Sequence, residues 1–124
     1  MKFVITGGAG FIGSHIAKHL VEKNHDVIIV DNLSRGRLAN LSTIKEQIEF
    51  KKIDILDFNS LKDIIFNSDG IFHQAALTSV PESFLQKEKY HNVNVKGTEN
   101  IFKLAKEFGK KVVYASSSSI YGNT

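Results

Sequence analysis

The sequence predicts an α/β fold in which helices cover both faces of a doubly wound parallel sheet, giving three αβα layers. Short apolar runs suited to buried strands alternate along the chain with amphipathic runs suited to helices. The resulting order, βαβαβαβαβ, requires right-handed crossovers between parallel strands. A glycine-rich turn joins the first strand to the first helix. Ligands of such sheets bind outside the carboxyl ends of the strands, so the site is expected there.

The glycine-rich turn spans residues 6–14, TGGAGFIGS, between a strand at residues 3–5 and an amphipathic helix. Gly7, Gly10 and Gly13 are each three residues apart. In a dinucleotide site one glycine permits the sharp turn, one lets the backbone approach a pyrophosphate, and one allows close helix packing. The helix N-terminus adds free N–H groups and a partial positive charge. A glycine turn without a ligand is the alternative reading of this motif alone.

A second feature favours dinucleotide binding over that alternative. Residues 27–30, VIIV, form a continuous apolar run suited to a strand buried on both faces. Asp31 follows at once, 18 residues after Gly13. An acid at the tip of the second strand is the residue that binds a ribose diol in dinucleotide sites. The alternative role of Asp31 is that of a turn residue or cap.

The remaining elements follow in order. We expect weak helical structure at residues 39–46, a strand at 49–53, a short helix capped by Ser60, a strand at 71–73, a long helix at 84–108, a strand at 111–115 and a loop at 116–124. In the long helix, Asn94 and Gly97 interrupt an apolar stripe. Gly97 costs a helix roughly 1 kcal/mol relative to alanine, so close packing is expected there. Asn94 is expected to tie the helix to the sheet backbone rather than to contact a ligand.

Small or polar residues stand at most of the predicted strand ends. Asp54 either bonds an adenine amino group or caps the next turn. His73 is expected to be a packed strand-end residue rather than a base. The serine run at 116–119 has hydroxyls that can bind a polar substrate or shuttle a proton; the alternative is a plain serine-rich loop.

Composition narrows the function further. The 124 residues suffice for one domain, and 16 basic against 13 acidic residues give a scattered net charge of +3, so nucleic-acid binding is not expected. With no cysteine there are no disulfides or thiolates, and the five histidines show no metal-ligand motif, so no metal is expected. No apolar run has the length of a membrane helix and no signal peptide is recognisable, so we expect a cytoplasmic protein without membrane contact.

Several motifs together resemble one family over the whole chain. They are TGGAGFIGS at 6–14, DNLS at 31–34, DI at 54–55, HQAALTSVPES at 73–83, NVKGT at 94–98 and YASSSSIYG at 114–122. The chain is similar to the N-terminal part of the extended short-chain dehydrogenase/reductases, specifically the NAD-dependent nucleotide-sugar epimerases. The resemblance implies a Rossmann-type domain, incomplete over residues 1–124, with NAD as cofactor and a UDP-sugar as substrate.

The resemblance also implies roles for individual positions. Those that match cofactor contacts are the pyrophosphate loop Gly7, Gly10, Phe11, Ile12 and Gly13; the ribose ligand Asp31; the adenosine segment Asn32, Leu33, Ser34, Arg35 and Gly36; the adenine contacts Asp54 and Ile55; the nicotinamide-ribose segment Gln74, Ala75, Ala76 and Thr78; and Val93.

The position matching the family's catalytic serine or threonine is Ser117, with Ser79 and Ser118 near the substrate as well. Sugar 4,6-dehydratases carry two acids after that position; Ser118 and Ser119 stand there instead, which argues against dehydration. The family's base belongs to a Tyr-x-x-x-Lys motif, and none of the three tyrosines has a lysine four residues later. We therefore expect the cofactor part of a UDP-sugar 4-epimerase, inactive alone and homodimeric when complete. Another UDP-sugar enzyme, such as a glucuronate 4-epimerase or a decarboxylase, and a non-catalytic NAD-binding module are the alternatives.

Overall fold

The computed structural model describes residues 1–33, 36–74 and 92–114, with the backbone alone at 92–94. The elements are β1 (Lys2–Thr6), α1 (Phe11–Glu22), β2 (Asp26–Val30), the 3₁₀ turns η1 (Leu38–Leu41) and η2 (Lys45–Gln47), β3 (Ile48–Lys51), α2 (Phe58–Phe66), β4 (Gly70–His73), the π-helical segment η3 (Asn92–Gly97), α5 (Thr98–Phe108) and β5 (Lys111–Tyr114).

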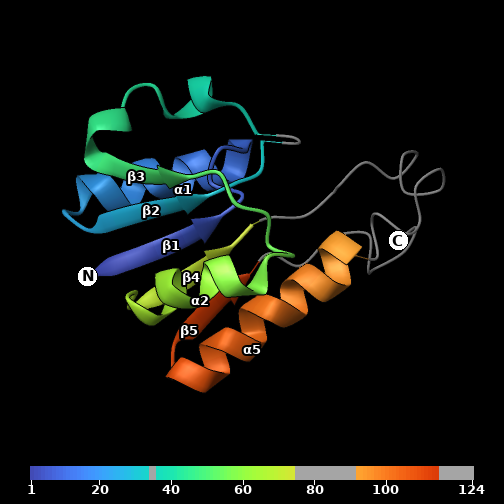
Figure 1. Ribbon diagram of the computed structural model, residues 1–124. Helices are drawn as coiled ribbons and strands as arrows, with labels where there is room; N and C mark the ends of the chain where they lie inside the picture. Colours follow the sequence, from blue (N-terminus) through green and yellow to red (C-terminus); the bar gives the residue numbers. More distant parts are fainter. Residues whose placement is uncertain (34–35, 75–91, 115–124) are drawn as a thin grey trace, which may run out of the picture.

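The five strands form one parallel sheet in the order β3-β2-β1-β4-β5 (Figure 1). β1 is central, and its last residue, Thr6, is in register with Val30 of β2 and His73 of β4. The strand order reverses between β1 and β4, which is the switch point of a doubly wound sheet. The predicted fold class is confirmed.

Two apolar cores separate the three layers. On one face, Ile5 and Ile29 of the sheet pack with Ala17 and Leu20 of α1. On the other face, the alternate strand residues pack against α2 and α5. The buried residues of this core, from the strands, the helices and the segment after β3, are Val4, Ile28, Val30, Ile55, Leu61, Ile65, Ile71, Ile101, Leu104 and Ala105. Alternate strand residues therefore serve opposite cores, because successive side chains of a strand point to opposite faces.

The start of α2 differs from the prediction. Ser60 is not the cap, because Asp57 occupies that position and its carboxylate accepts the Ser60 N–H at 3.3 Å and the Ser60 hydroxyl at 2.6 Å. Other boundaries moved slightly: the third strand is Ile48–Lys51, and the weak helix at 39–46 consists of η1 and η2. Asp57 satisfies N–H groups that the first helical turn cannot bond internally, so the helix begins earlier than Ser60 suggested.

The long helix enters the described part of the chain as π-helix, and its predicted start at 84–91 lies outside that part. Gly97 is buried, and a Cβ there would collide with the side chain of Ile55, as its position in the apolar stripe indicated. The side chain of Asn94 lies outside the described residues. Asn100 ties α5 to the segment after β3, because its amide donates to the Ile55 carbonyl at 2.9 Å.

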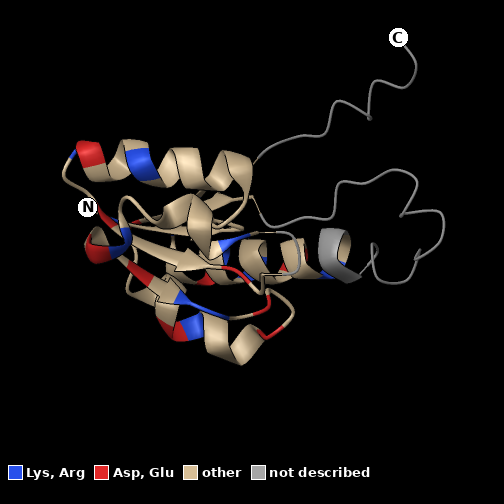
Figure 2. Cartoon of the chain, turned by 90° about the horizontal axis from the view of Figure 1, so that it is seen from above, with Lys and Arg blue, Asp and Glu red and all other residues tan. Residues whose placement is uncertain are grey.

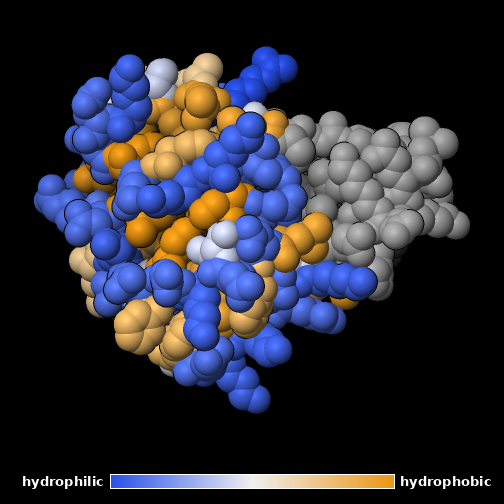
Figure 3. Space-filling model, viewed as in Figure 1, coloured by the Kyte–Doolittle hydropathy of each residue, from blue (hydrophilic) through white to orange (hydrophobic). Residues whose placement is uncertain are grey.

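On the surface, basic and acidic residues are interspersed along the elements (Figure 2). Apolar groups show between hydrophilic side chains on the face that carries α2 and α5 (Figure 3). Phe66 is 59% exposed there, and its ring meets that of Phe108 edge-on at 5.1 Å. Among the described residues, no helix is long and apolar enough to span a membrane.

His73 is a packed strand-end residue, as expected, and it joins three elements. Its Nδ1 lies 2.6 Å from the Thr6 hydroxyl of β1, and its Nε2 lies 2.8 Å from the Thr98 hydroxyl of α5. A neutral imidazole fits both contacts, because it donates at one nitrogen and accepts at the other. Burial lowers the pKa of His73 from 6.5 to about 4. The ring is therefore uncharged at neutral pH.

The low pKa of His73 predicts acid destabilisation. Between pH 6.5 and 4 the imidazole of His73 binds a proton in the unfolded chain but not in the native chain. The free energy of unfolding therefore falls as the pH drops through this window. The loss attributable to His73 is about 3 kcal/mol by pH 4, with no further loss below. Urea unfolding at pH 4 to 8 should show a steeper decline for the wild type than for His73→Gln. Parallel curves would contradict the shifted pKa.

Candidate functional site

The glycine turn leaves β1 at the switch point and closes on itself. Gly7 adopts φ +68°, a left-handed conformation that a residue with a Cβ rarely takes. Its N–H donates to the Val30 carbonyl of β2 at 2.7 Å, and the Gly10 N–H donates back to the Gly7 carbonyl at 3.1 Å. Gly10 is then the N-cap of α1. The turn is thereby held to the ends of two neighbouring strands.

Close packing explains the other glycines of the turn. A Cβ on Gly13 would collide with the Gly7 carbonyl oxygen and lie 2.8 Å from the Gly8 Cα, so Gly13 lets α1 approach the turn. A Cβ on Gly8 would lie 2.6 Å from Ile29 of β2. The spacing predicted close packing at one of Gly7, Gly10 and Gly13 and did not indicate Gly8. The adjacent glycine pair in the sequence was the signal that could have found it.

The N-terminus of α1 is open for an anion. A Cβ on Gly10 would meet only the Gly7 carbonyl oxygen, at 3.3 Å. Phe11 is 76% and Ile12 59% exposed, and the first N–H groups of a helix have no partner within it. Within the described part of the chain no side chain caps this end, and the first turn of α1 holds no acid. Free N–H groups at a helix N-terminus, beside backbone that bears no Cβ, suit a pyrophosphate.

Asp31, at the tip of β2, is buried and faces the glycine turn. Its Oδ2 accepts the Ala9 N–H at 3.0 Å, and its Oδ1 accepts the Leu33 N–H at 2.7 Å. The bond to Leu33 shows that Asp31 does act as a turn residue. An ionised carboxylate has about four acceptor positions, so both oxygens keep capacity for further donors. A ribose diol would supply such donors.

The segment after β2 wraps closely around this carboxylate. A Cβ on Gly36 would lie 2.6 Å from Asp31 Oδ2 and 2.8 Å from the Ala9 Cβ. Leu33 has φ +63°, which is unusual for a residue with a Cβ and costs roughly 1–2 kcal/mol. The short bond from its N–H to Asp31 offsets part of that cost. Ser34 and Arg35 lie outside the described residues.

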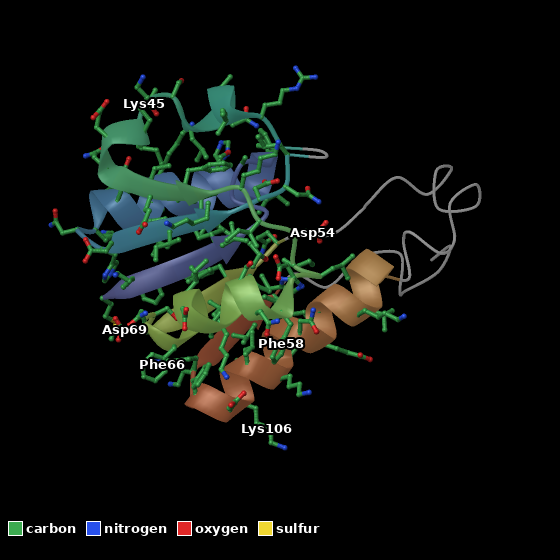
Figure 4. The ribbon with its side chains drawn as sticks, in the orientation of Figure 1. Lys45, Asp54, Phe58, Phe66, Asp69 and Lys106 are labelled. Atoms are coloured by element: carbon green, nitrogen blue, oxygen red, sulfur yellow. The ribbon has the colours of Figure 1, made fainter. Side chains whose placement is uncertain are left out.

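Asp54, after β3, lies at the same carboxyl edge of the sheet (Figure 4). Its Oδ2 accepts the Asn32 amide at 3.1 Å, and its Oδ1 accepts the Leu56 N–H at 2.9 Å. Asp54 therefore caps the following turn, one of its two expected roles, and joins the segments after β2 and β3. Ile55 is buried in the core beneath it.

Asn40 holds the glycine turn from its outer side and was not anticipated. Its side-chain amide donates to the Ala9 carbonyl at 2.8 Å, and the Arg37 N–H donates to the same oxygen at 3.0 Å. The Ala9 peptide is thus bonded at both its N–H and its carbonyl oxygen. No local pattern indicated Asn40, because its partner lies 31 residues away.

The remaining predicted site residues are placed only in part. Gln74 follows β4, and its N–H donates to the Thr6 hydroxyl at 3.0 Å and the Thr6 carbonyl at 2.9 Å. The backbone of Val93 belongs to η3. Outside the described residues lie Ala75, Ala76, Thr78, Ser79, Ser117 and Ser118. Within the described ranges, no group of three His, Cys, Asp or Glu side chains could hold a metal.

Sequence comparison identifies relatives of this arrangement. The chain is 40% identical over 98% of its length to UDP-N-acetyl-alpha-D-glucosaminuronate decarboxylase of Bacillus cytotoxicus, of which it covers 38%. It is 36% identical over 98% of its length to UDP-glucose 4-epimerase of Dictyostelium discoideum, again covering 38%. The chain thus spans well under half the length of these curated relatives.

Structural comparison agrees. UDP-N-acetylglucosamine 4-epimerase from Methanobrevibacter ruminantium, solved with UDP-N-acetylmuramic acid, matches with a TM-score of 0.92 and 38% identity over 99% of this chain and 40% of that one. UDP-glucose 4-epimerase from Brucella ovis, solved with NAD, matches with a TM-score of 0.88 and 32% identity over 98% of this chain and 37% of that one. The profile of the NAD dependent epimerase/dehydratase family matches residues 3–124. With this match and the arrangement of the glycine turn, Asp31 and the parallel sheet, the chain belongs to the NAD dependent epimerase/dehydratase family.

Proposed function

We propose that this chain is the NAD-binding part of a UDP-sugar 4-epimerase. The observation that carries the proposal is the buried Asp31 carboxylate, bonded to Ala9 of the glycine turn at the switch point of the sheet. That arrangement brings a diol acceptor beside a helix N-terminus that suits a pyrophosphate. Relatives named UDP-glucose 4-epimerase and solved structures with NAD or UDP-sugars support it.

The described residues divide the binding of NAD among the strand ends. Gly7, Gly10 and the first N–H groups of α1 would hold the pyrophosphate, and Asp31 would hold the adenosine ribose. Asn32 and Asp54 would lie along the adenosine. When bound, NAD would supply hydride transfer from and to C4 of the sugar. The chain's own part in that chemistry is to orient the cofactor.

Residues 1–124 form an incomplete cofactor domain in this proposal. Ser117 would hydrogen-bond the reacting C4 oxygen, with Ser79 and Ser118 near the sugar. Tyr90 and Tyr114 have Asn94 and Ser118 four residues later, so neither belongs to the expected Tyr-x-x-x-Lys motif. Homodimerisation of a longer protein and a cytoplasmic location remain predictions of the sequence.

A UDP-sugar decarboxylase is the second candidate, because a relative of that activity is 40% identical. The two candidates share the cofactor site and differ in the sugar that they accept. Assays with UDP-glucose and a UDP-uronic acid, with release of carbon dioxide as the readout, separate them. Binding of NAD without turnover in the full-length protein would instead indicate a non-catalytic module.

Asp31 predicts a preference for NAD over NADP. A buried carboxylate accepts hydrogen bonds from a free 2′-hydroxyl and repels a 2′-phosphate, so NADP should bind at least about tenfold more weakly. Calorimetric titration of both cofactors measures this ratio, with Asp31→Asn narrowing it. Asp26→Asn, at the exposed opposite end of β2, is the matched control and should change nothing. Equal or tighter binding of NADP to the wild type would contradict this role of Asp31 and point to Arg35.

The 124-residue chain by itself should not epimerise UDP-galactose or UDP-N-acetylgalactosamine. Proton transfer from the sugar hydroxyl needs a positioned base, worth typically 10²–10⁴-fold in rate, and His73 is buried with both ring nitrogens bonded. The assay compares this chain with one extended by the substrate domain and Tyr-x-x-x-Lys motif of a relative, each with NAD. Steady turnover by the short chain would show that the base lies within it.

Ser117→Ala in an extended, active enzyme should lower kcat by about 10²-fold, because it removes a donor to the developing charge on the C4 oxygen. NAD affinity, measured by calorimetry, should stay unchanged. Ser118→Ala is the neighbouring comparison. A larger loss from Ser118→Ala with no loss from Ser117→Ala would show that the register of the serine run is wrong.

A further inference from the structure

We propose that His73 is a positioning residue of the cofactor site, acting as a neutral bridge between the hydroxyls of Thr6 and Thr98. This inference rests on the proposed NAD site and adds a residue that does not itself touch the cofactor. It explains why a histidine, rather than an apolar residue, ends the buried strand β4.

The His73 bridge lies between three segments of the proposed site. Thr6, His73 and Thr98 each stand next to a different part of the proposed site. Thr6 directly precedes the glycine turn, and His73 directly precedes Gln74. Thr98 directly follows η3, which carries Val93. The His73 imidazole, on β4, thus contacts β1 and the start of α5. Each of these three elements adjoins a segment of the proposed cofactor site.

The contacts are short; the one between Thr6 and His73 is buried, and the one between His73 and Thr98 is partly buried. Thr6 is fully buried and His73 is 6% exposed, with nitrogen-to-oxygen distances of 2.6 and 2.8 Å to the two hydroxyls. The Thr6 hydroxyl also accepts the Gln74 N–H at 3.0 Å. Buried hydrogen bonds of this kind are directional, and removing one partner leaves the other unsatisfied. The network therefore sets the position of each segment relative to the others.

The helix α5 has an unusual start. η3 is π-helical, a geometry that is frequent at functional sites. It is fixed against the segment after β3 by Gly97, whose Cα approaches the Ile55 side chain. The bond from Thr98 to His73 fixes the same end of the helix to β4.

The test uses isosteric variants of Thr98 in the protein at its natural length. Thr98→Val removes the hydroxyl and should weaken NAD binding about fivefold to tenfold, the equivalent of one hydrogen bond. Thr98→Ser keeps the hydroxyl and should bind within about twofold of the wild type. The exposed neighbour Glu99→Gln is the control for a change on this helix. Calorimetry gives the affinities, and thermal melts confirm that each variant is folded.

A double-mutant cycle separates positioning from general destabilisation. In a His73→Phe background, Thr98→Val should no longer change NAD affinity, because its effect passes through the imidazole. If His73→Phe does not fold, the Thr98 pair decides alone. The amide NMR signal of Gln74 in the cofactor-free protein is a second readout and should shift in Thr98→Val but not in Glu99→Gln.

Two results overturn the inference. One is a wild type that binds NAD while Thr98→Val binds equally well. The other is an unchanged Gln74 signal in Thr98→Val, which decides the matter even if the wild type does not bind NAD. A wild type that fails to bind NAD overturns the proposed function, and the Gln74 signal then still tests the bridge.

Discussion

The parallel pairing of β1 with both β2 and β4 is the constraint on which the rest of the structure depends. β1 lies between β2 and β4, and the segments that follow these two strands pack on opposite faces of the sheet. The segment after β1 leads into α1 on one face of the sheet, whereas α5, which follows the segment after β4, packs on the other. The glycine turn therefore leaves β1 at the point where the chain segments go to opposite faces of the sheet. Its backbone conformation follows from that position, because it must turn sharply at Gly7 while bonded to Val30.

Buried polar groups gather at this same edge of the sheet. Thr6, Asp31 and His73 lie at strand ends there, and Ser14 lies in the first turn of α1. Each has a hydrogen-bond partner, and no buried side-chain nitrogen or oxygen is unsatisfied within the described residues. A buried polar group that loses its partner costs roughly 1–3 kcal/mol, so such groups are maintained only where they are bonded. Among the described residues, four of the five buried polar side chains lie at this edge; at the opposite edge Ser68 is buried and bonded to the Ile65 carbonyl, and Asp69 is exposed (Figure 4).

Cofactor recognition and sugar chemistry are separated along the chain in the proposed function. The glycine turn, Asp31 and Asp54 belong to the first half of the sequence and lie within well-packed elements. The serine run begins only after β5. This division agrees with the similarity of the chain to relatives named as epimerases and as decarboxylases. In the proposed function the part shared with both would orient NAD.

The sequence by itself determined the fold class and four of the five strands to within about one residue, and it predicted that the glycine turn and Asp31 lie at one edge of the sheet, where the structure places them. Its strongest signals were local: apolar runs of strand length, glycines at fixed spacing, and an acid directly after a buried strand. Such local patterns predict structure well because steric and hydrophobic constraints act between residues that are close in the chain. Gly97 belongs to this group, since a glycine in an apolar helical stripe already indicated close packing.

Only the tertiary structure decided which residues meet across the sheet. The contacts of Gly8 with Ile29, Asn40 with Ala9, Asn100 with Ile55 and His73 with Thr98 join residues 21 to 45 positions apart. No periodicity encodes such pairs, because they arise when the crossovers bring separate strand ends to one edge. The cap of α2 shows the same limit at short range. Asp57 and Ser60 are both good capping residues. The turn after β3 places Asp57, and not Ser60, at the N-cap of α2.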